Sequence, residues 1–241
     1  AESGYEQITA AQFIANPTPA KLAAVILAQE EKQMSYVQTL YKPEVSQKAY
    51  VFFPYAGGGA EAYANLAGSI SRQDHTIALY FVPYLQDFDS CALAAEEIAF
   101  LAKDKDVYFY SHCAGSAVAL KILELLESKY GNIVKHYFAA ANVPTKTIFA
   151  LNGWRWIPRR VILHILGKAG APANFIQEAG YRERLERFKS DTDFAARVFS
   201  DGLGRCQCPT TLLLGKGDLF TRYFRFPEKQ WSDYAGRIDH I

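Results

Sequence analysis

The feature that most constrains the fold is an alternation of short apolar runs with stretches of helical spacing, which begins at Ala49. Short buried runs joined by amphipathic helices are typical of parallel strands with crossover connections. The chain is therefore predicted to fold as an α/β protein with a mostly parallel, doubly wound sheet. The predicted strands cover residues 49–53, 76–81, 106–110, 134–141, 209–214 and a last one from 238, and the predicted helices cover 61–71, 90–103 and 114–130.

Two parts of the chain do not follow this alternation. Residues 152–201 contain helical segments without a convincing strand, so we expect an inserted helical lid over the site. Residues 1–28 read as short helices with a turn at Asn16-Pro17-Thr18-Pro19. Residues 29–48 are polar and lack periodicity, which predicts a linker before a main domain at 49–241.

Charge and hydropathy argue against two classes of partner. The 26 lysines and arginines balance 25 acidic residues without a long basic run, so neither nucleic acid nor an anionic membrane is an expected partner. No apolar stretch approaches the roughly 18 residues of a membrane helix. The opening Ala1-Glu2-Ser3-Gly4 lacks the pattern of a secretory signal, so we expect a cytoplasmic protein.

Four cysteines, Cys91, Cys113, Cys206 and Cys208, are too few and too scattered for a disulfide scaffold. A reducing compartment fits this usage. Cys206 and Cys208 are separated by one residue and lack a second Cys/His pair, so we expect two core or loop thiols and no metal site.

Cys113 differs from the other cysteines because Ser111-His112-Cys113-Ala114-Gly115 joins a predicted strand directly to a predicted helix. Many hydrolases place their nucleophile on such a turn, in the pattern Gly-x-Ser-x-Gly. An ordinary buried thiol is the commoner fate of a free cysteine. The strand–turn–helix setting and the glycine-rich segment upstream instead favour Cys113 as a nucleophile.

The same turn also predicts how the thiol would be ionised and which backbone groups would bind the oxyanion. The helix that follows Cys113 has its positive end at the thiol, which is expected to lower the thiol pKa. The backbone N–H of Ala114 would face a substrate oxyanion, and Ala56, in the turn Tyr55-Ala56-Gly57, would supply the second donor.

Four segments resemble a known family. Phe53-Pro54-Tyr55-Ala56-Gly57-Gly58 is similar to the Phe-Pro-His-Ala-Gly-Gly of thioesterases that serve polyketide and nonribosomal peptide synthetases. The segment from Ser111 to Gly115 resembles their Gly-His-Ser-Met-Gly, with cysteine replacing serine. Residues 209–218 resemble the strand and loop that carry their acid, and Asp191-Thr192-Asp193-Phe194 resembles the lid of the type II subgroup. The resemblance covers residue 49 to the end and implies an α/β-hydrolase fold.

The resemblance implies that Asp218 is the acid of a catalytic triad. Elsewhere in the family the acid follows the strand after the nucleophile, but here that strand ends at Ala140-Ala141-Asn142 without a carboxylate. Asn142 is a poor substitute, so Asp218 is the predicted acid.

The N-terminal segment Phe13-Ile14-Ala15-Asn16-Pro17-Thr18-Pro19 resembles the closing helices of an acyl or peptidyl carrier domain. The expected partner is therefore a carrier domain of the same synthetase, which presents an acyl or peptidyl substrate on phosphopantetheine. No cofactor of the domain's own is expected.

A Cys–His–Asp relay needs a histidine base. His75, His112, His136 and His164 are expected to be structural, whereas His240 follows Asp218, the chain order that the fold requires. Residues 237–241 resemble the last strand, and the base in the family comes just beyond it, so the base is expected past Ile241, with His240 as the alternative.

The predicted function is an offloading thioesterase that receives an acyl chain on Cys113 and releases it by cyclisation to a lactone or lactam, or by hydrolysis. Two alternatives stay open at this point: a stand-alone type II editing thioesterase that hydrolyses misprimed carriers, and a carrier-docking module without catalysis.

Overall fold

The computed structural model describes residues 18–20, 35–142, 158, 160–161, 181–218, 221 and 226–240. The chain divides into two compact units, Ala1–Ser35 and Tyr36–Ile241. The predicted carrier segment at 1–28 lies outside the described residues apart from 18–20, so its carrier origin stays a prediction. The second unit contains the sheet and is described below.

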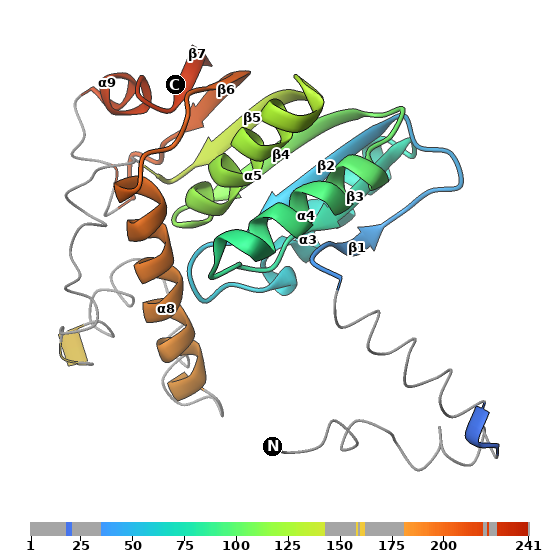
Figure 1. Cartoon of the computed structure of the whole chain (residues 1–241), viewed down its shortest axis with the longest axis horizontal. Coiled ribbons are helices and arrows are strands. Elements are labelled where there is room, and N and C mark those ends of the chain that lie inside the picture. The colour runs from blue at the N-terminus through green and yellow to red at the C-terminus, as the bar shows by residue number, and fades with distance from the viewer. Residues whose placement is uncertain are drawn as a thin grey trace. The chain divides into compact units, whose positions relative to one another are not determined.

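Seven strands form one sheet in the order β1-β3-β2-β4-β5-β6-β7 (Figure 1). Only β1 runs antiparallel to its neighbour; the other five pairings are parallel. The predicted α/β class with a mostly parallel, doubly wound sheet is confirmed. The strands are β1 Gln38–Tyr41, β2 Lys48–Phe53, β3 Ile77–Phe81, β4 Asp106–His112, β5 Val134–Ala140, β6 Cys206–Leu213 and β7 Ala235–His240.

The predicted linker at 29–48 needs a correction at its C-terminal end. Strand β1 pairs with β3 at the sheet edge, and the compact unit starts at Tyr36 rather than at residue 49. Between residues 35 and 48, the described part of this segment, only Val37 is buried, and β1 is half to fully exposed. A short edge strand needs few apolar residues, which is why its sequence resembles a linker.

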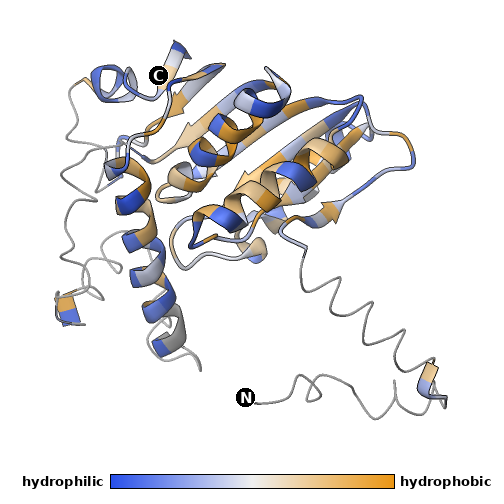
Figure 2. Ribbon diagram, in the orientation of Figure 1, coloured by the Kyte–Doolittle hydropathy of each residue, from blue (hydrophilic) through white to orange (hydrophobic). Residues whose placement is uncertain are grey.

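Helices cover both faces of the sheet. Along β2, Val51 and Phe53 belong to the same core cluster as residues of helices α4 (Phe88–Leu101) and α5 (Gly115–Tyr130). Figure 1 shows these two helices over one face of the sheet. Phe52 points the other way, toward helix α3 (Ala64–Gln73), which follows the 3₁₀ turn η2 (Ala60–Tyr63). This alternation follows from the two-residue period of a strand. Figure 2 shows apolar residues concentrated on the sheet and on the helix faces against it.

Within the predicted insertion, the structure describes chiefly helix α8, Tyr181–Ser200, which packs beside α5 (Figure 1). The residues between β5 and α8 lie almost entirely outside the described ones. The short helix α9 (Pro227–Trp231) was not expected; its Trp231 is fully buried and donates from Nε1 to the Asn142 carbonyl at 3.0 Å. Among the described helices, none has the length and hydropathy to cross a membrane.

The strand order defines where a site can form. Strand β2 lies between β3 and β4, so the chain leaves β2 toward one edge and returns to build the other. In open α/β sheets, ligands bind at the carboxyl ends of the strands beside such a switch point. The pairings Phe53↔Ser111, Ser111↔Ala139 and Ala139↔Leu212 bring the ends of β2, β4, β5 and β6 to one edge.

Candidate active site

Cys113 lies at a sharp turn between β4 and α5. Its φ is +52°, in the left-handed region that residues other than glycine seldom adopt. Its N–H donates to the Ala140 carbonyl at 2.9 Å, and its carbonyl accepts from Ser116 N at 3.1 Å. The predicted strand–turn–helix is therefore observed, and the turn holds Cys113 in a conformation that costs backbone strain.

Close packing explains why the second glycine of the Gly-x-Ser-x-Gly pattern is kept at Gly115. A Cβ on Gly115 would lie 2.3 Å from the Pro54 carbonyl oxygen and 2.8 Å from that of Phe53. The first turn of α5 therefore touches the backbone that leaves β2. This contact places the turn at Cys113 against the turn that carries Ala56.

Ser111 replaces the first glycine of the usual pattern, and a buried hydroxyl cluster accommodates it. Its Oγ lies 2.9 Å from Ser116 Oγ and 2.7 Å from the Tyr137 hydroxyl. All three side chains are fully buried, so these bonds satisfy hydroxyls that would otherwise be costly beneath the turn. Sequence reasoning missed Tyr137, since nothing in the strand pattern of β5 marks it as a partner of β4.

The segment after β2 forms a tight turn. Gly58 N donates to the Tyr55 carbonyl at 2.8 Å, and Gly57 has φ +75°, the geometry that a type II turn requires at its third residue. Ala56 is the second residue of this turn and is buried. The predicted donors Ala56 and Ala114 thus belong to two turns in direct contact, through Pro54 and Gly115.

The ionisation of Cys113 differs from the expectation. Burial raises the pKa of the thiol to about 11, although the Ala114 N–H lowers it, and the Asp218 charge raises it further. The prediction that the helix terminus would favour the thiolate is wrong for this environment, because desolvation outweighs the backbone donor. Cys113 on its own is a protonated thiol at neutral pH.

Asp218 lies in the loop after β6, as predicted. It is half-buried, its N–H donates to the Gly215 carbonyl at 3.0 Å, and its Oδ2 accepts from the Thr221 hydroxyl. Its charge acts on both Cys113 and His112. The structure therefore brings Asp218 into the electrostatic neighbourhood of Cys113, across the ends of β4, β5 and β6.

Asn142, the poorer candidate for the acid position, is 3% exposed. Its carbonyl accepts from Trp231, and its side-chain nitrogen has no hydrogen-bond partner among the described residues.

The histidines occupy different settings. His112 is half-buried with its ring edge-on to Tyr55 at 5.6 Å, and burial lowers its pKa while the Asp218 charge opposes that change. His136 Nε2 lies 2.8 Å from Thr211 Oγ1, which bridges β5 and β6. His240 ends β7, and its side chain lies outside the described residues, as does His164. The choice between His240 and a later histidine is therefore still a prediction.

The remaining cysteines are buried: Cys91 in α4, and Cys206 and Cys208 in β6. Over the described ranges, the structure contains no group of three or more metal-ligating side chains.

Asp191 is a second site residue whose contacts sequence reasoning did not anticipate. It is a fully buried carboxylate on α8 that accepts from Gly57 N at 2.7 Å and from Gln86 Nε2 at 3.0 Å. The sequence marks this segment only through a family resemblance, because a single sequence does not show that an aspartate on a polar helix reaches a turn 134 residues away.

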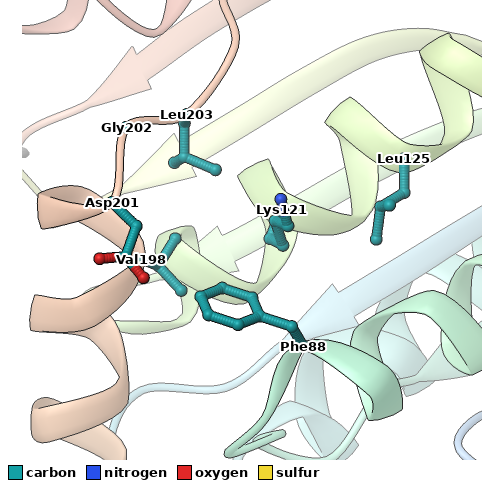
Figure 3. A pocket seen from close by; sticks show the side chains of 7 residues that line it. All are labelled: Phe88, Lys121, Leu125, Val198, Asp201, Gly202 and Leu203. Carbon is teal, nitrogen blue, oxygen red and sulfur yellow. The ribbon is translucent and has the colours of Figure 1, made fainter.

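A pocket of about 340 Å³ lies between α4, α5 and the end of α8 (Figure 3). Its lining does not include the predicted site residues. Phe88 of α4, Lys121 of α5 and Asp201 after α8 contribute to its lining (Figure 3), and Lys121 is paired with Glu124 at 2.6 Å. The lining residues are Phe88, Lys121, Leu125, Val198, Asp201, Gly202 and Leu203.

The parallel sheet and the strand–turn–helix at Cys113 agree with a match to a known protein family. Residues 50–235 match the thioesterase domain family, so the chain belongs to that family. The sheet with its helices matches solved thioesterases of the α/β-hydrolase fold, which confirms the predicted fold. The comparison with curated protein sequences gave no match.

Three solved structures illustrate the likeness. RedJ, the thioesterase of prodiginine biosynthesis in Streptomyces coelicolor, has a TM-score of 0.65 at 17% identity, over 83% of this chain and 84% of RedJ. YbtT, a type II thioesterase of the yersiniabactin NRPS/PKS pathway, has a TM-score of 0.57 at 17% identity, over 86% and 89%. SrfTE, the thioesterase domain that cyclises surfactin, has a TM-score of 0.52 at 15% identity, over 86% and 85%.

Proposed function

We propose that this chain is a thioesterase of a nonribosomal peptide or polyketide synthetase that uses Cys113 as its nucleophile. It takes an acyl or peptidyl chain from phosphopantetheine on a carrier domain and releases it by cyclisation or hydrolysis. One observation carries the proposal: Cys113 lies on the strained turn between β4 and α5, against the turn of Ala56 and within reach of the Asp218 charge. The turn presents a side chain at the carboxyl edge of the sheet, where substrates bind.

The first half-reaction is a thioester exchange. The Cys113 sulfur attacks the substrate carbonyl, the tetrahedral oxyanion accepts hydrogen bonds from Ala56 and Ala114 N–H, and the bond to the phosphopantetheine sulfur breaks. The base takes the proton of Cys113 and passes it to the departing phosphopantetheine thiol. In the second half-reaction an internal amine or hydroxyl, or water, attacks the acyl-enzyme and Cys113 regains a proton.

A raised thiol pKa makes the base essential. With a pKa of about 11, Cys113 must lose its proton to a neighbouring imidazole as it attacks. We assign this role to a histidine that follows Asp218, either His240 or one past Ile241, with Asp218 orienting it.

Sulfur as the nucleophile bears on the fate of the acyl group. Exchange between two thioesters is nearly isoenergetic, whereas an oxyester intermediate would lie lower in energy. The acyl-enzyme on Cys113 stays activated, which supports cyclising release by an internal amine or hydroxyl, with hydrolysis as the second route. The likeness to SrfTE agrees with the first outcome.

Editing of misprimed carriers is a second candidate function. YbtT is named as a type II thioesterase, and the match covers most of both chains. The segment at 1–28, proposed as the tail of a fused carrier domain, argues instead for offloading in cis.

Turnover on a carrier-bound acyl or peptidyl thioester tests this proposal, with products separated by liquid chromatography and mass spectrometry. We expect Cys113→Ala to abolish release, and Cys91→Ala, which changes a buried thiol in α4, to retain it. Full product release by Cys113→Ala would overturn the assignment of Cys113 as the nucleophile. Release of linear acid alone would remove cyclisation, and a wild-type protein that binds the carrier without releasing product would favour a docking module.

A further inference from the structure

The carboxylate of Asp191 is 0% exposed although it projects from a helix rich in charged residues. A buried carboxylate is unfavourable unless hydrogen-bond donors surround it. Two donors meet it: Gly57 N–H at Oδ2 (2.7 Å) and the Gln86 amide at Oδ1 (3.0 Å). The two oxygens therefore join α8 to the turn after β2 and to the loop after β3.

The bond to Gly57 fixes one of the two peptide planes on either side of Ala56. The Gly57 N–H belongs to the planar Ala56–Gly57 unit, which Asp191 holds. The Tyr55 carbonyl belongs to the Tyr55–Ala56 unit, which the 2.8 Å bond from Gly58 N holds. Since the Ala56 N–H lies in that second unit, the two bonds together set its direction.

The bond to Gln86 extends the same network to the start of α5. The Gln86 carbonyl accepts from Arg197 on α8 at 2.8 Å, and the Tyr84 hydroxyl donates to the Ala114 carbonyl at 3.1 Å. The Phe194 ring lies 5.5 Å from Phe88 and 6.4 Å from Tyr84. Helix α8 and the loop after β3 thus contact both turns that carry the proposed oxyanion donors.

We infer that Asp191 is a positioning residue that aims the Ala56 N–H at the substrate oxyanion and makes this donor depend on the seating of α8. The inference rests on the proposed roles of Cys113 and Ala56. Asp191 touches neither the substrate nor the thiol; it acts through the Ala56–Gly57 peptide.

Two reactions of Cys113 separate positioning from general folding. Acylation by a thioester forms an oxyanion, whereas alkylation by iodoacetamide displaces iodide at a saturated carbon and forms none. We expect Asp191→Ala to slow acylation by on the order of 10²-fold, mainly in kcat, because loss of one oxyanion donor has this size of effect. The alkylation rate should stay within about twofold of the wild type, since the thiol is unchanged.

Two further variants serve as controls. Asp191→Asn keeps an oxygen for Gly57 N–H, and Gln86 can turn its amide to accept from the new nitrogen, so most of the acylation rate should return. Asp193→Ala removes a half-buried carboxylate from the same helix outside this network, and should acylate like the wild type. Intact mass spectrometry follows both reactions, and thermal unfolding is recorded for each variant.

Equal losses in acylation and alkylation, together with a lower melting temperature, would show a structural role only and overturn the inference. Unchanged acylation in Asp191→Ala would overturn it as well. Failure of the proposed function has a different signature, since the wild type itself would be alkylated at Cys113 and never acylated there.

Discussion

At the scale of single residues, Cys113 combines a strained backbone conformation with a thiol that resists ionisation. The turn holds Cys113 in a left-handed backbone conformation directly after β4, while burial and the Asp218 charge raise the pKa of its thiol to about 11. A thiol of this kind is unreactive until a base removes its proton, because the thiolate is the nucleophile. Under the proposed function, the sulfur becomes a nucleophile only when a base takes this proton.

The raised pKa predicts how Cys113 reacts with iodoacetamide as pH changes. A group whose pKa is about 11 is ionised in about one molecule in ten thousand at pH 7, and this fraction rises about tenfold per pH unit. We expect the alkylation rate of this 241-residue chain to rise with a slope near one from pH 7 to 10, measured by intact mass with Cys113→Ala as the blank. A plateau reached below about pH 8 would contradict this and indicate an imidazole already paired with the thiol.

At the scale of elements, the site depends on how closely α5 approaches the end of β2. Gly115 allows its backbone to touch the Phe53 and Pro54 carbonyls, and the hydroxyls of Ser111, Ser116 and Tyr137 tie β4, α5 and β5 together beneath the turn. The two turns are held by rigid elements rather than by loops alone, which suits donors that must point at a developing charge.

Gly115→Ala should therefore damage the fold itself. A methyl group 2.3 Å from a backbone oxygen forces α5 away from β2, and overpacking of this kind costs about 1–3 kcal/mol or more. Gly217→Ala is the matched control, since a Cβ there meets nothing within 4 Å. Urea unfolding should show a large loss of stability for Gly115→Ala alone, and equal midpoints for the two variants would refute the close contact.

The parts of the fold that were predicted from sequence are those with a strong periodic signal. The five central strands and three helices were placed within a few residues, since buried parallel strands are nearly continuous apolar runs. Strand β1 was missed because an edge strand is only partly buried, and α9 because five residues are too few to show a period.

The strand–turn–helix of the candidate site was predictable from sequence, because a local motif around Cys113 and Gly115 encodes it. Asp191 and Tyr137 were not, because each acts through a contact that only the assembled fold creates. The sign of the Cys113 pKa shift was wrong for the same reason: the helix terminus is visible in the sequence, whereas burial is not.

At the scale of the whole molecule, a family fold carries a cysteine on the strand–turn–helix where many hydrolases place their nucleophile. Residues 50–235 match the thioesterase domain family, and the site forms at the carboxyl ends of β2 and β4, where the sheet changes direction. A seven-stranded sheet of this kind supports many chemistries, so the activity must come from the residues at its edge. The central claim is that Cys113 itself carries the acyl group.

Trapping of the acyl-enzyme tests that claim most directly. The protein is mixed with an acyl phosphopantetheine thioester, quenched in acid and mapped by peptide mass spectrometry. We predict one acyl group, on the peptide that contains Cys113, removable by neutral hydroxylamine as a thioester and missing from Cys113→Ala. An acyl group on Ser111, Ser116 or any other residue, or the same acylation in Cys113→Ala, would contradict the account.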